Sequence, residues 1–255
     1  MAYLGNSLGI GSSAVTASAS ALSPFTNTYS VDFDGTDDYA AANTVATSYA
    51  SDTTGSVSAW IKMDDATPAS ASTIFSISDA SSATYMSLYV NPEGRLTFVV
   101  QKSGTNQVFV RTDPASFVDA TWYHVAVVQD GVLPILYING SAPTQSTLIS
   151  TDVTSFLADL TGLDVCTIGA LRYINSTTLY WSGLIEETAY FSTALSAAQV
   201  AAIYNSGEPA DLTPYSPSGW WRFEEGSGTS IADSSGNGHT ATLTNGPTFS
   251  TDVPT

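Results

Sequence analysis

Residues 121–129 (TWYHVAVVQ) and 135–139 (ILYIN) decide how this chain folds. Both stretches are rich in β-branched and aromatic residues, which fit the pleated surface of a sheet. Asp130-Gly131 after the first stretch is a tight-turn signal, and the second stretch ends in Asn139-Gly140. The sequence therefore predicts two strands in succession, each followed by a turn.

Similar signals recur from residue 29 to about residue 210. Residues 57–63 and 96–101 alternate in the period of two that a strand with one buried face requires. Helical periodicity is almost absent, except that Ser196 and Gln199 have the spacing of a capping box and predict one short helix. Strands at this spacing indicate an all-β fold, an antiparallel two-sheet jelly-roll sandwich.

Composition divides the chain into three segments. Residues 1–28 carry no charge and are rich in Ser, Ala and Gly, so they cannot build a core of their own, yet they are too apolar for a plain linker. We expect them to form an extended arm that orders against either the body of the chain or a partner subunit. Residues 29–210 hold the strand signals. Residues 211–255 form a small β-rich extension, which supplies either added strands or a partial second module.

The charge balance excludes two classes of partner. The chain has 255 residues, six basic against 23 acidic side chains and a net charge of −17. Nucleic-acid binding needs clustered Lys and Arg to replace counterions on phosphate, and an anionic membrane needs them too. We expect no nucleic acid and no membrane among the partners. An acidic surface suits neutral ligands, cations or other proteins.

Targeting and redox signals are also weak. The first charged residue is Asp32, so the basic region of a secretory signal peptide is missing and we expect no such signal. No apolar run approaches the roughly 18 residues of a membrane span. The single cysteine, Cys166, lies in a strand-like stretch and is expected to be a buried small apolar side chain.

Seven short motifs occur in an order that resembles the laminin-G-like jelly roll of the concanavalin-A-like lectin and glucanase superfamily. They are Val31-Asp32-Phe33-Asp34-Gly35, Ser58-Ala59-Trp60-Ile61, Trp122-Tyr123-His124-Val125-Ala126, Tyr137-Ile138-Asn139-Gly140, Ile168-Gly169, Gly183-Leu184-Ile185-Glu186-Glu187 and Ala194-Leu195-Ser196. The Trp220-Trp221-Arg222-Phe223 segment resembles the start of such a module, although here it comes last. Modules with this tail and an N-terminal arm look like those on structural proteins of tailed bacteriophages.

A turn with three carboxylates suggests a cation site. Asp34, Asp37 and Asp38 lie within five residues, and calcium binds several oxygens from loops. The resemblance implies that Glu186, at a position where the family has Asp, is a fourth member. We expect a structural calcium ion here, with a solvated acidic turn as the alternative.

A second candidate site is expected around residues 173–181. Sugar binding uses exposed aromatic faces with amide groups at the rim, and Tyr173, Asn175, Tyr180 and Trp181 provide these groups in a Ser/Thr-rich loop. The alternative is that Tyr180 and Trp181 only flank a strand.

Catalysis is disfavoured by the placement of the carboxyl groups. Glycoside hydrolysis needs two of them on one face, about 5–9 Å apart. The adjacent pair Glu186 and Glu187 is expected to point to opposite faces of a strand. His124 is expected to pack in a sheet and His239 to be solvated, and neither has a neighbour at zinc-ligand spacing. We expect no enzymatic activity and no catalytic residue.

These observations and the resemblance together imply a non-catalytic virion structural protein, either a capsid decoration or a fibre subunit. It would be made in the host cytoplasm and assembled in many copies on the virion surface. Its arm would contact capsid or tail proteins and sister subunits, and its jelly roll would bind surface glycans. A free carbohydrate-binding or adhesion lectin is the alternative, and a glycoside hydrolase of the same fold is the less favoured one.

Overall fold

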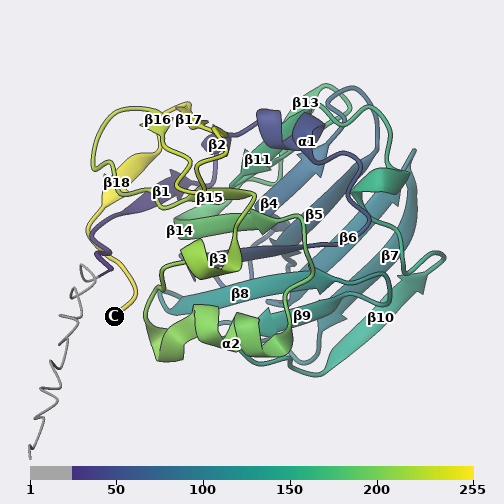
Figure 1. Cartoon of the computed structure of the whole chain (residues 1–255), viewed down its shortest axis with the longest axis horizontal. Coiled ribbons are helices and arrows are strands. Elements are labelled where there is room, and N and C mark those ends of the chain that lie inside the picture. The colour runs from purple at the N-terminus through teal and green to yellow at the C-terminus, as the bar shows by residue number, and fades with distance from the viewer. Residues whose placement is uncertain (1–24) are drawn as a thin grey trace, which may run out of the picture.

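The computed structural model describes residues 25–255. In this range the chain forms two antiparallel sheets packed face to face, with a short two-stranded hairpin at one edge (Figure 1). This confirms the predicted two-sheet jelly-roll sandwich. No helix among these residues is long and apolar enough to cross a membrane.

The first sheet has the order β18-β1-β14-β3-β8-β9, with β15 paired to β14. Its strands are β1 (Ser30–Asp34), β3 (Gly55–Met63), β8 (Trp122–Gln129), β9 (Ile135–Ile138), β14 (Ser182–Phe191), β15 (Gly219–Trp221) and β18 (Thr248–Ser250). The strands predicted at residues 121–129 and 135–139 are β8 and β9, which pair antiparallel with Val127 opposite Leu136.

The second sheet has the order β10-β7-β6-β5-β4-β11-β2-β17-β16. Its strands are β2 (Tyr39–Ala41), β4 (Ser72–Ser78), β5 (Tyr85–Val90), β6 (Leu96–Lys102), β7 (Thr105–Thr112), β10 (Gln145–Ser150), β11 (Val165–Ile168), β16 (Ser230–Ile231) and β17 (Ala241–Thr244). The edge hairpin joins β12 (Leu171–Tyr173) to β13 (Ser176–Thr178).

Helices are few in the described chain. They are α1 (Thr44–Ser48), α2 (Ala197–Tyr204) and the 3-10 turns η1 (Leu157–Asp159), η2 (Asn205–Gly207) and η3 (Thr213–Tyr215). The predicted capping box is confirmed at α2, where the Ser196 hydroxyl accepts a hydrogen bond from the Gln199 backbone N–H at 3.3 Å. Val200 and Ile203 of α2 pack on the outer side of the first sheet.

The main core lies between the two sheets and follows from strand alternation. Val125 and Val127 of β8 point into it, while Ala126 and Val128 point outward to the α2 cluster. Cys166 is fully buried in the main core, as predicted, and burial raises the pKa of its thiol. Burial excludes water from these apolar side chains and is the main stabilising term of the fold.

Both histidine side chains are buried, although only His124 was expected to be. His124 packs in the first sheet as predicted, with Nε2 2.9 Å from the Ser58 hydroxyl and its ring against Trp60. The prediction that His239 is solvated is wrong. Its side chain is buried, with Nδ1 2.8 Å from the Thr44 hydroxyl. The turn-rich loop folds back onto α1, which a local reading of the loop could not show.

Residues 211–255 supply strands to both sheets. β15 pairs with β14, β18 pairs with β1, and β17 pairs with β2. Trp221 of β15 lies in the main core, and its Nε1 donates to the His239 carbonyl at 2.7 Å. The last 45 residues therefore take part in the same hydrogen-bonded sandwich as the rest of the chain.

The expected N-terminal arm, residues 1–28, lies largely outside the described residues, which begin at Phe25. Residues 25–29 lie against the body. The Phe25 ring is stacked on Trp220 with centroids 6.1 Å apart, and Glu224 accepts hydrogen bonds from the backbone N–H groups of Thr28 and Tyr29. The described end of this segment is therefore attached to the region around β14 and β15.

Candidate functional site

The acidic turn after β1 brings three carboxylates together. Oxygens of Asp34, Asp37 and Asp38 all lie within 4.8 Å of one another. Gly35 adopts a left-handed φ of +74°, and a Cβ there would lie 2.8 Å from the Cβ of Ser182. Only glycine allows the turn to approach the start of β14 this closely.

Backbone N–H groups organise this turn. Asp34 Oδ1 accepts from the Thr36 N–H at 2.8 Å, and Asp38 Oδ2 accepts from the Asp34 N–H at 3.1 Å. The remaining oxygens of the three carboxylates accept no hydrogen bond from the described residues. This arrangement fits a hard cation, because several carboxylate oxygens converge without a positive side chain among them.

The local electrostatics agree with that fit. Burial raises the pKa of Asp38, and the charges of Asp34, Asp37 and Asp32 raise it further. Burial also raises the pKa of Asp32, to which Asp64 and Asp34 add. Mutual repulsion among carboxylates disfavours their charged forms, and a bound cation would relieve it.

Glu186, the expected fourth member, is not part of this cluster. Asp34 lies opposite Ser182 in the β1–β14 pair, and three residues of β14 separate Ser182 from Glu186. The Glu186 side chain is fully buried on the outer side of the sheet, where its Oε1 accepts from the Asn27 side chain at 3.1 Å. The prediction that Glu186 joins the cation site is therefore wrong.

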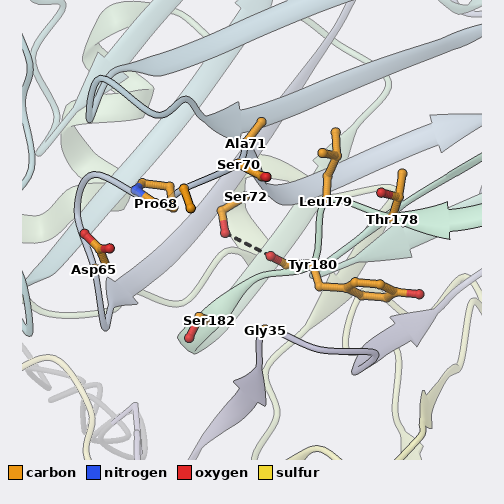
Figure 2. Close-up of a pocket in the computed structure, with 11 residues that line it drawn as sticks. Gly35, Asp65, Pro68, Ser70, Ala71, Ser72, Thr178, Leu179, Tyr180 and Ser182 are labelled. Atoms are coloured by element: carbon orange, nitrogen blue, oxygen red, sulfur yellow. Dashed lines mark hydrogen bonds between the residues drawn. The ribbon is translucent and has the colours of Figure 1, made fainter.

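A cavity of about 430 Å³ lies directly beside the Gly35 turn (Figure 2). Its walls come from the Gly35 turn, the loop before β4, and the segment that joins β13 to β14. Small hydroxyl-bearing and apolar side chains make up most of the lining: Gly35, Asp65, Pro68, Ala69, Ser70, Ala71, Ser72, Thr178, Leu179, Tyr180 and Ser182.

The structure separates the four residues predicted for glycan binding. Tyr180 lines the cavity, and its backbone carbonyl accepts from the Ser72 hydroxyl at 2.9 Å (Figure 2). Tyr173 contacts the Tyr85 ring instead, and Asn175 lies in the tip of the β12–β13 hairpin. The prediction that Trp181 is exposed is wrong: it is 0% exposed and belongs to the main core.

The alternation of side chains along an extended segment explains why Tyr180 lies at the surface and Trp181 is buried. Successive residues of an extended segment point to opposite sides, so Tyr180 at the surface places Trp181 inside. The loop of residues 65–72 was missed in the sequence. Apart from Asp65 its residues are small and uncharged and match no motif, and the only available signal was a Ser/Ala-rich stretch after Asp64-Asp65.

The expectation that Glu186 and Glu187 point to opposite faces is also wrong. The β14–β3 register shifts between Glu186 and Ala189, and Glu187 has a left-handed φ of +46°. This bulge adds a residue to the strand and turns both carboxyl groups to the outer side of the sheet. Both are buried beneath residues 25–29 and the Trp220 region, and neither lines the cavity.

Comparison with known proteins agrees with this architecture. This chain belongs to the concanavalin A-like lectin/glucanases superfamily, whose laminin-G-like family model matches residues 34–201. No curated protein matches the sequence.

Solved structures with the same fold include a carbohydrate-binding module of a sialidase. The Ruminococcus gnavus IT-sialidase CBM40 module superposes with a TM-score of 0.59 at 16% identity, covering 69% of this chain and 96% of the module. That module has also been solved with α2,3-sialyllactose bound. A Bacteroides ovatus protein provisionally described as carbohydrate-binding gives a TM-score of 0.62 at 20% identity, over 91% of this chain and 62% of that protein. At these identities the likeness shows a lectin-like fold.

Proposed function

We propose that this chain is a non-catalytic glycan-binding module and that the cavity beside the Gly35 turn is its binding site. The observation that carries the proposal is a juxtaposition. Tyr180 and the acidic Gly35 turn, which the sequence pointed to as two separate sites, border the same cavity.

The lining has the chemistry that a sugar ring requires. Pro68, Leu179 and Tyr180 offer apolar and aromatic surface, against which the C–H face of a pyranose packs. Ser70, Thr178 and other hydroxyl groups around them exchange hydrogen bonds with sugar hydroxyls. A cavity of about 430 Å³ lies in the size range of small-ligand sites.

Calcium has a supporting role in this proposal. An ion held by Asp34, Asp37 and Asp38 would neutralise the turn and hold the wall of the cavity that Gly35 forms. Its contribution is structural, and no chemical step passes through it.

Matched aromatic variants test the location of the site. On an array of immobilised oligosaccharides, Tyr180→Ala is expected to reduce binding of the recognised glycan at least tenfold. Tyr173→Ala removes a comparable, partly buried tyrosine that does not line the cavity, and it should leave binding within a factor of two. Loss of binding with Tyr173→Ala alone would place the site on the β12–β13 hairpin and contradict the proposal.

The absence of catalysis belongs to the same proposal. The one pair of carboxyl groups that the β14 bulge brings together is buried rather than open to a substrate, and burial raises both pKa values. Release of reducing ends from any polysaccharide by the purified protein would overturn the claim, provided that Glu186→Gln abolishes the release.

We further propose that the module is displayed in many copies on a virus particle, as a capsid decoration or fibre subunit. Support comes from the family resemblance of the motifs and from the attachment of residues 25–29 to the body. Arg222 donates a hydrogen bond to the Thr26 carbonyl, and Glu224 accepts hydrogen bonds from the backbone N–H groups of Thr28 and Tyr29. In this proposal the uncharged residues 1–24 contact a capsid protein or a sister subunit.

Sedimentation of particles from a lysate that contains the protein tests this setting. Full-length protein should co-sediment with particles in a fixed copy number, and removal of residues 1–24 should abolish this. The truncation keeps residues 25–29 and all of their contacts with the body, so the melting temperature should not change. Glycan binding without particle association would favour the free lectin.

A further inference from the structure

We infer that the cavity selects uncharged sugars and rejects glycans that carry carboxylate or sulfate groups. This inference rests on the proposed function and adds the class of ligand to it. The module of related fold from Ruminococcus gnavus has been solved with a sialylated, anionic ligand. The charges around the present cavity lead to the opposite preference for this chain.

Six carboxylates lie in or near the lining of the cavity. Asp65 lines it directly, and Asp64 accepts a 2.8 Å hydrogen bond from Ser182, another lining residue. The acidic turn places three more beside the lining residue Gly35: Asp34, Asp37 and Asp38. Asp32 completes the set, since it lies on β1 two residues before Asp34.

The charges act on the cavity as well as on each other. The pKa of Tyr180 is raised, first by burial and then by the charge of Asp37. The field of the acidic turn therefore reaches the Tyr180 side chain, whose residue lines the cavity. An anionic substituent on a sugar near Tyr180 would lie in the same negative potential.

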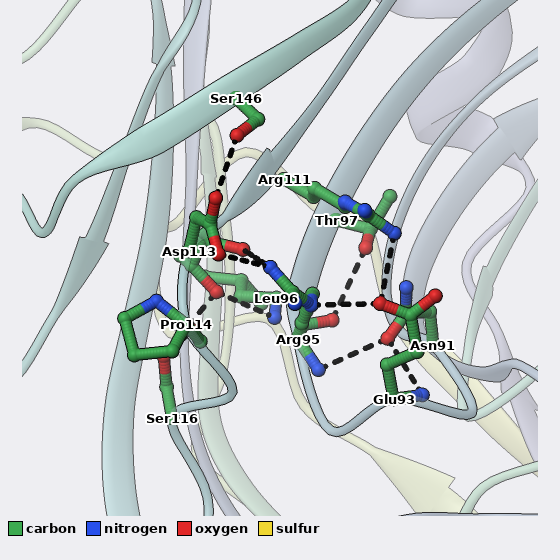
Figure 3. Close-up of polar contacts among 11 residues, drawn as sticks. Asn91, Glu93, Arg95, Leu96, Thr97, Arg111, Asp113, Pro114, Ser116 and Ser146 are labelled. Atoms are coloured by element: carbon green, nitrogen blue, oxygen red, sulfur yellow. Dashed lines mark hydrogen bonds and ion pairs between the residues drawn. The ribbon is translucent and has the colours of Figure 1, made fainter.

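Compensating positive charge is absent from the lining. None of the six basic side chains, all within the described residues, lines the cavity. Lys62, two residues before Asp64, is paired with Asp252 at 2.5 Å. Arg95, just before β6, is paired with both Glu93 and Asp113, and Arg111 of β7 is paired with Glu93, as Figure 3 shows.

The other three cations are placed elsewhere. Arg222 pairs with Glu187 at 2.9 Å on the outer side of the first sheet. Lys102 ends β6, and Arg172 lies in the edge hairpin. Even a divalent cation at the acidic turn would offset only two of the six negative charges, so the sign of the potential stays the same.

Binding to matched oligosaccharides tests the inference. The probe is an array that presents neutral oligosaccharides beside their sialylated, sulfated and uronic-acid derivatives, read at about 0.05 M and 0.5 M salt with millimolar calcium. We expect binding to a neutral series and at least tenfold weaker binding to its acidic derivatives at low salt. The difference should shrink at high salt, because screening over about 10 Å at 0.1 M weakens the repulsion.

A charge-neutralising variant identifies the cause. Asp64→Asn with Asp65→Asn retains hydrogen-bond acceptors at both positions and removes two of the six charges. Its binding to the acidic derivatives should rise at least threefold, while binding to the neutral series changes less. Asp130→Asn, which removes one exposed charge in the turn after β8, is the control and should change neither.

The outcomes separate this inference from the proposed function. Equal or tighter binding of the acidic derivatives by the unmodified protein would overturn the inference and leave a glycan-binding module. Unchanged discrimination in the Asp64→Asn, Asp65→Asn variant would also overturn it, because another feature would then select the ligand. Absence of binding to every member of the array would overturn the proposed function itself.

Discussion

The indole Nε1 of Trp220 donates a 2.6 Å hydrogen bond to Oε2 of Glu187, a carboxyl group that is only 3% exposed. Arg222 donates to the other oxygen of Glu187 at 2.9 Å, so both oxygens are satisfied from the last segment of the chain. Glu186, the adjacent residue, has one oxygen bonded to Asn27 and one without a partner among the described residues. The β14 bulge thus joins residues 25–29 and β15 to the first sheet.

Loss of the Trp220 donor should destabilise the protein. Trp220→Phe retains most of the apolar surface and leaves a buried carboxylate oxygen of Glu187 without its partner, which costs about 1–3 kcal/mol of unfolding free energy. Trp122→Phe is the control, since its Nε1 bonds at 2.9 Å to the largely exposed Asp252 and should cost less than about 1 kcal/mol. Urea denaturation measures both, and equal effects would show that the Trp220–Glu187 bond is unimportant.

The same carboxyl pair predicts a stability that falls in mild alkali. Burial raises the pKa of Glu186 to about 9, aided by the charge of Glu187, and burial raises that of Glu187 to about 8 against the opposing effect of Arg222. In the unfolded chain both groups lose their protons near pH 4.5. Between these values the folded state holds more protons, so the unfolding free energy decreases as pH rises.

The window from pH 7 to pH 8.5 isolates this effect. Burial lowers the pKa of His124 from 6.5 to about 3, which makes stability rise with pH below 6.5 and would obscure the signal there. We expect a decrease on the order of 1 kcal/mol per pH unit in this window. Glu186→Gln should flatten the profile, whereas Glu208→Gln, on the exposed surface, should not. A flat profile for the unmodified protein would contradict the assignment.

Calcium should stabilise the protein through the acidic turn. A ligand that binds only the folded state raises the unfolding free energy, and 1 kcal/mol corresponds to about 2–4 °C in a domain of this size. Millimolar calcium is expected to raise Tm by several degrees, and chelator should reverse the change. Asp37→Asn should remove the response, whereas Glu186→Gln should retain it, because Glu186 lies outside the cluster. An unchanged Tm in the native protein would exclude the ion.

Substitution of two adjacent aromatic residues should separate stability from binding. Trp181→Ala removes a fully buried core side chain and is expected to cost about 3–5 kcal/mol. Tyr180→Ala removes a partly exposed ring at the cavity and should cost less than half of that while reducing glycan binding. Circular dichroism melts and glycan binding, measured on both variants, check the assignment. Weak binding by a stably folded Trp181→Ala variant would contradict it.

Much of the fold followed from local signals in the chain. The strands β8 and β9 and the capping box of Ser196 with Gln199 depend on side chains within a few residues of each other, and short-range periodicity reports these directly. The burial of Cys166 and the clustering of Asp34, Asp37 and Asp38 are equally local.

Only the tertiary structure decided the rest. The direction of the Glu187 side chain depends on a bulge, which one extra residue in β14 relative to β3 creates and no residue type announces. The burial of His239 depends on a loop that returns to α1 from a distant position in the chain. The cavity itself exists because Gly35 lets the β1 turn approach Ser182, which places Tyr180 and the loop of residues 65–72 around one space. Contacts of this kind join residues far apart in the chain, and a periodic pattern carries information only about neighbours.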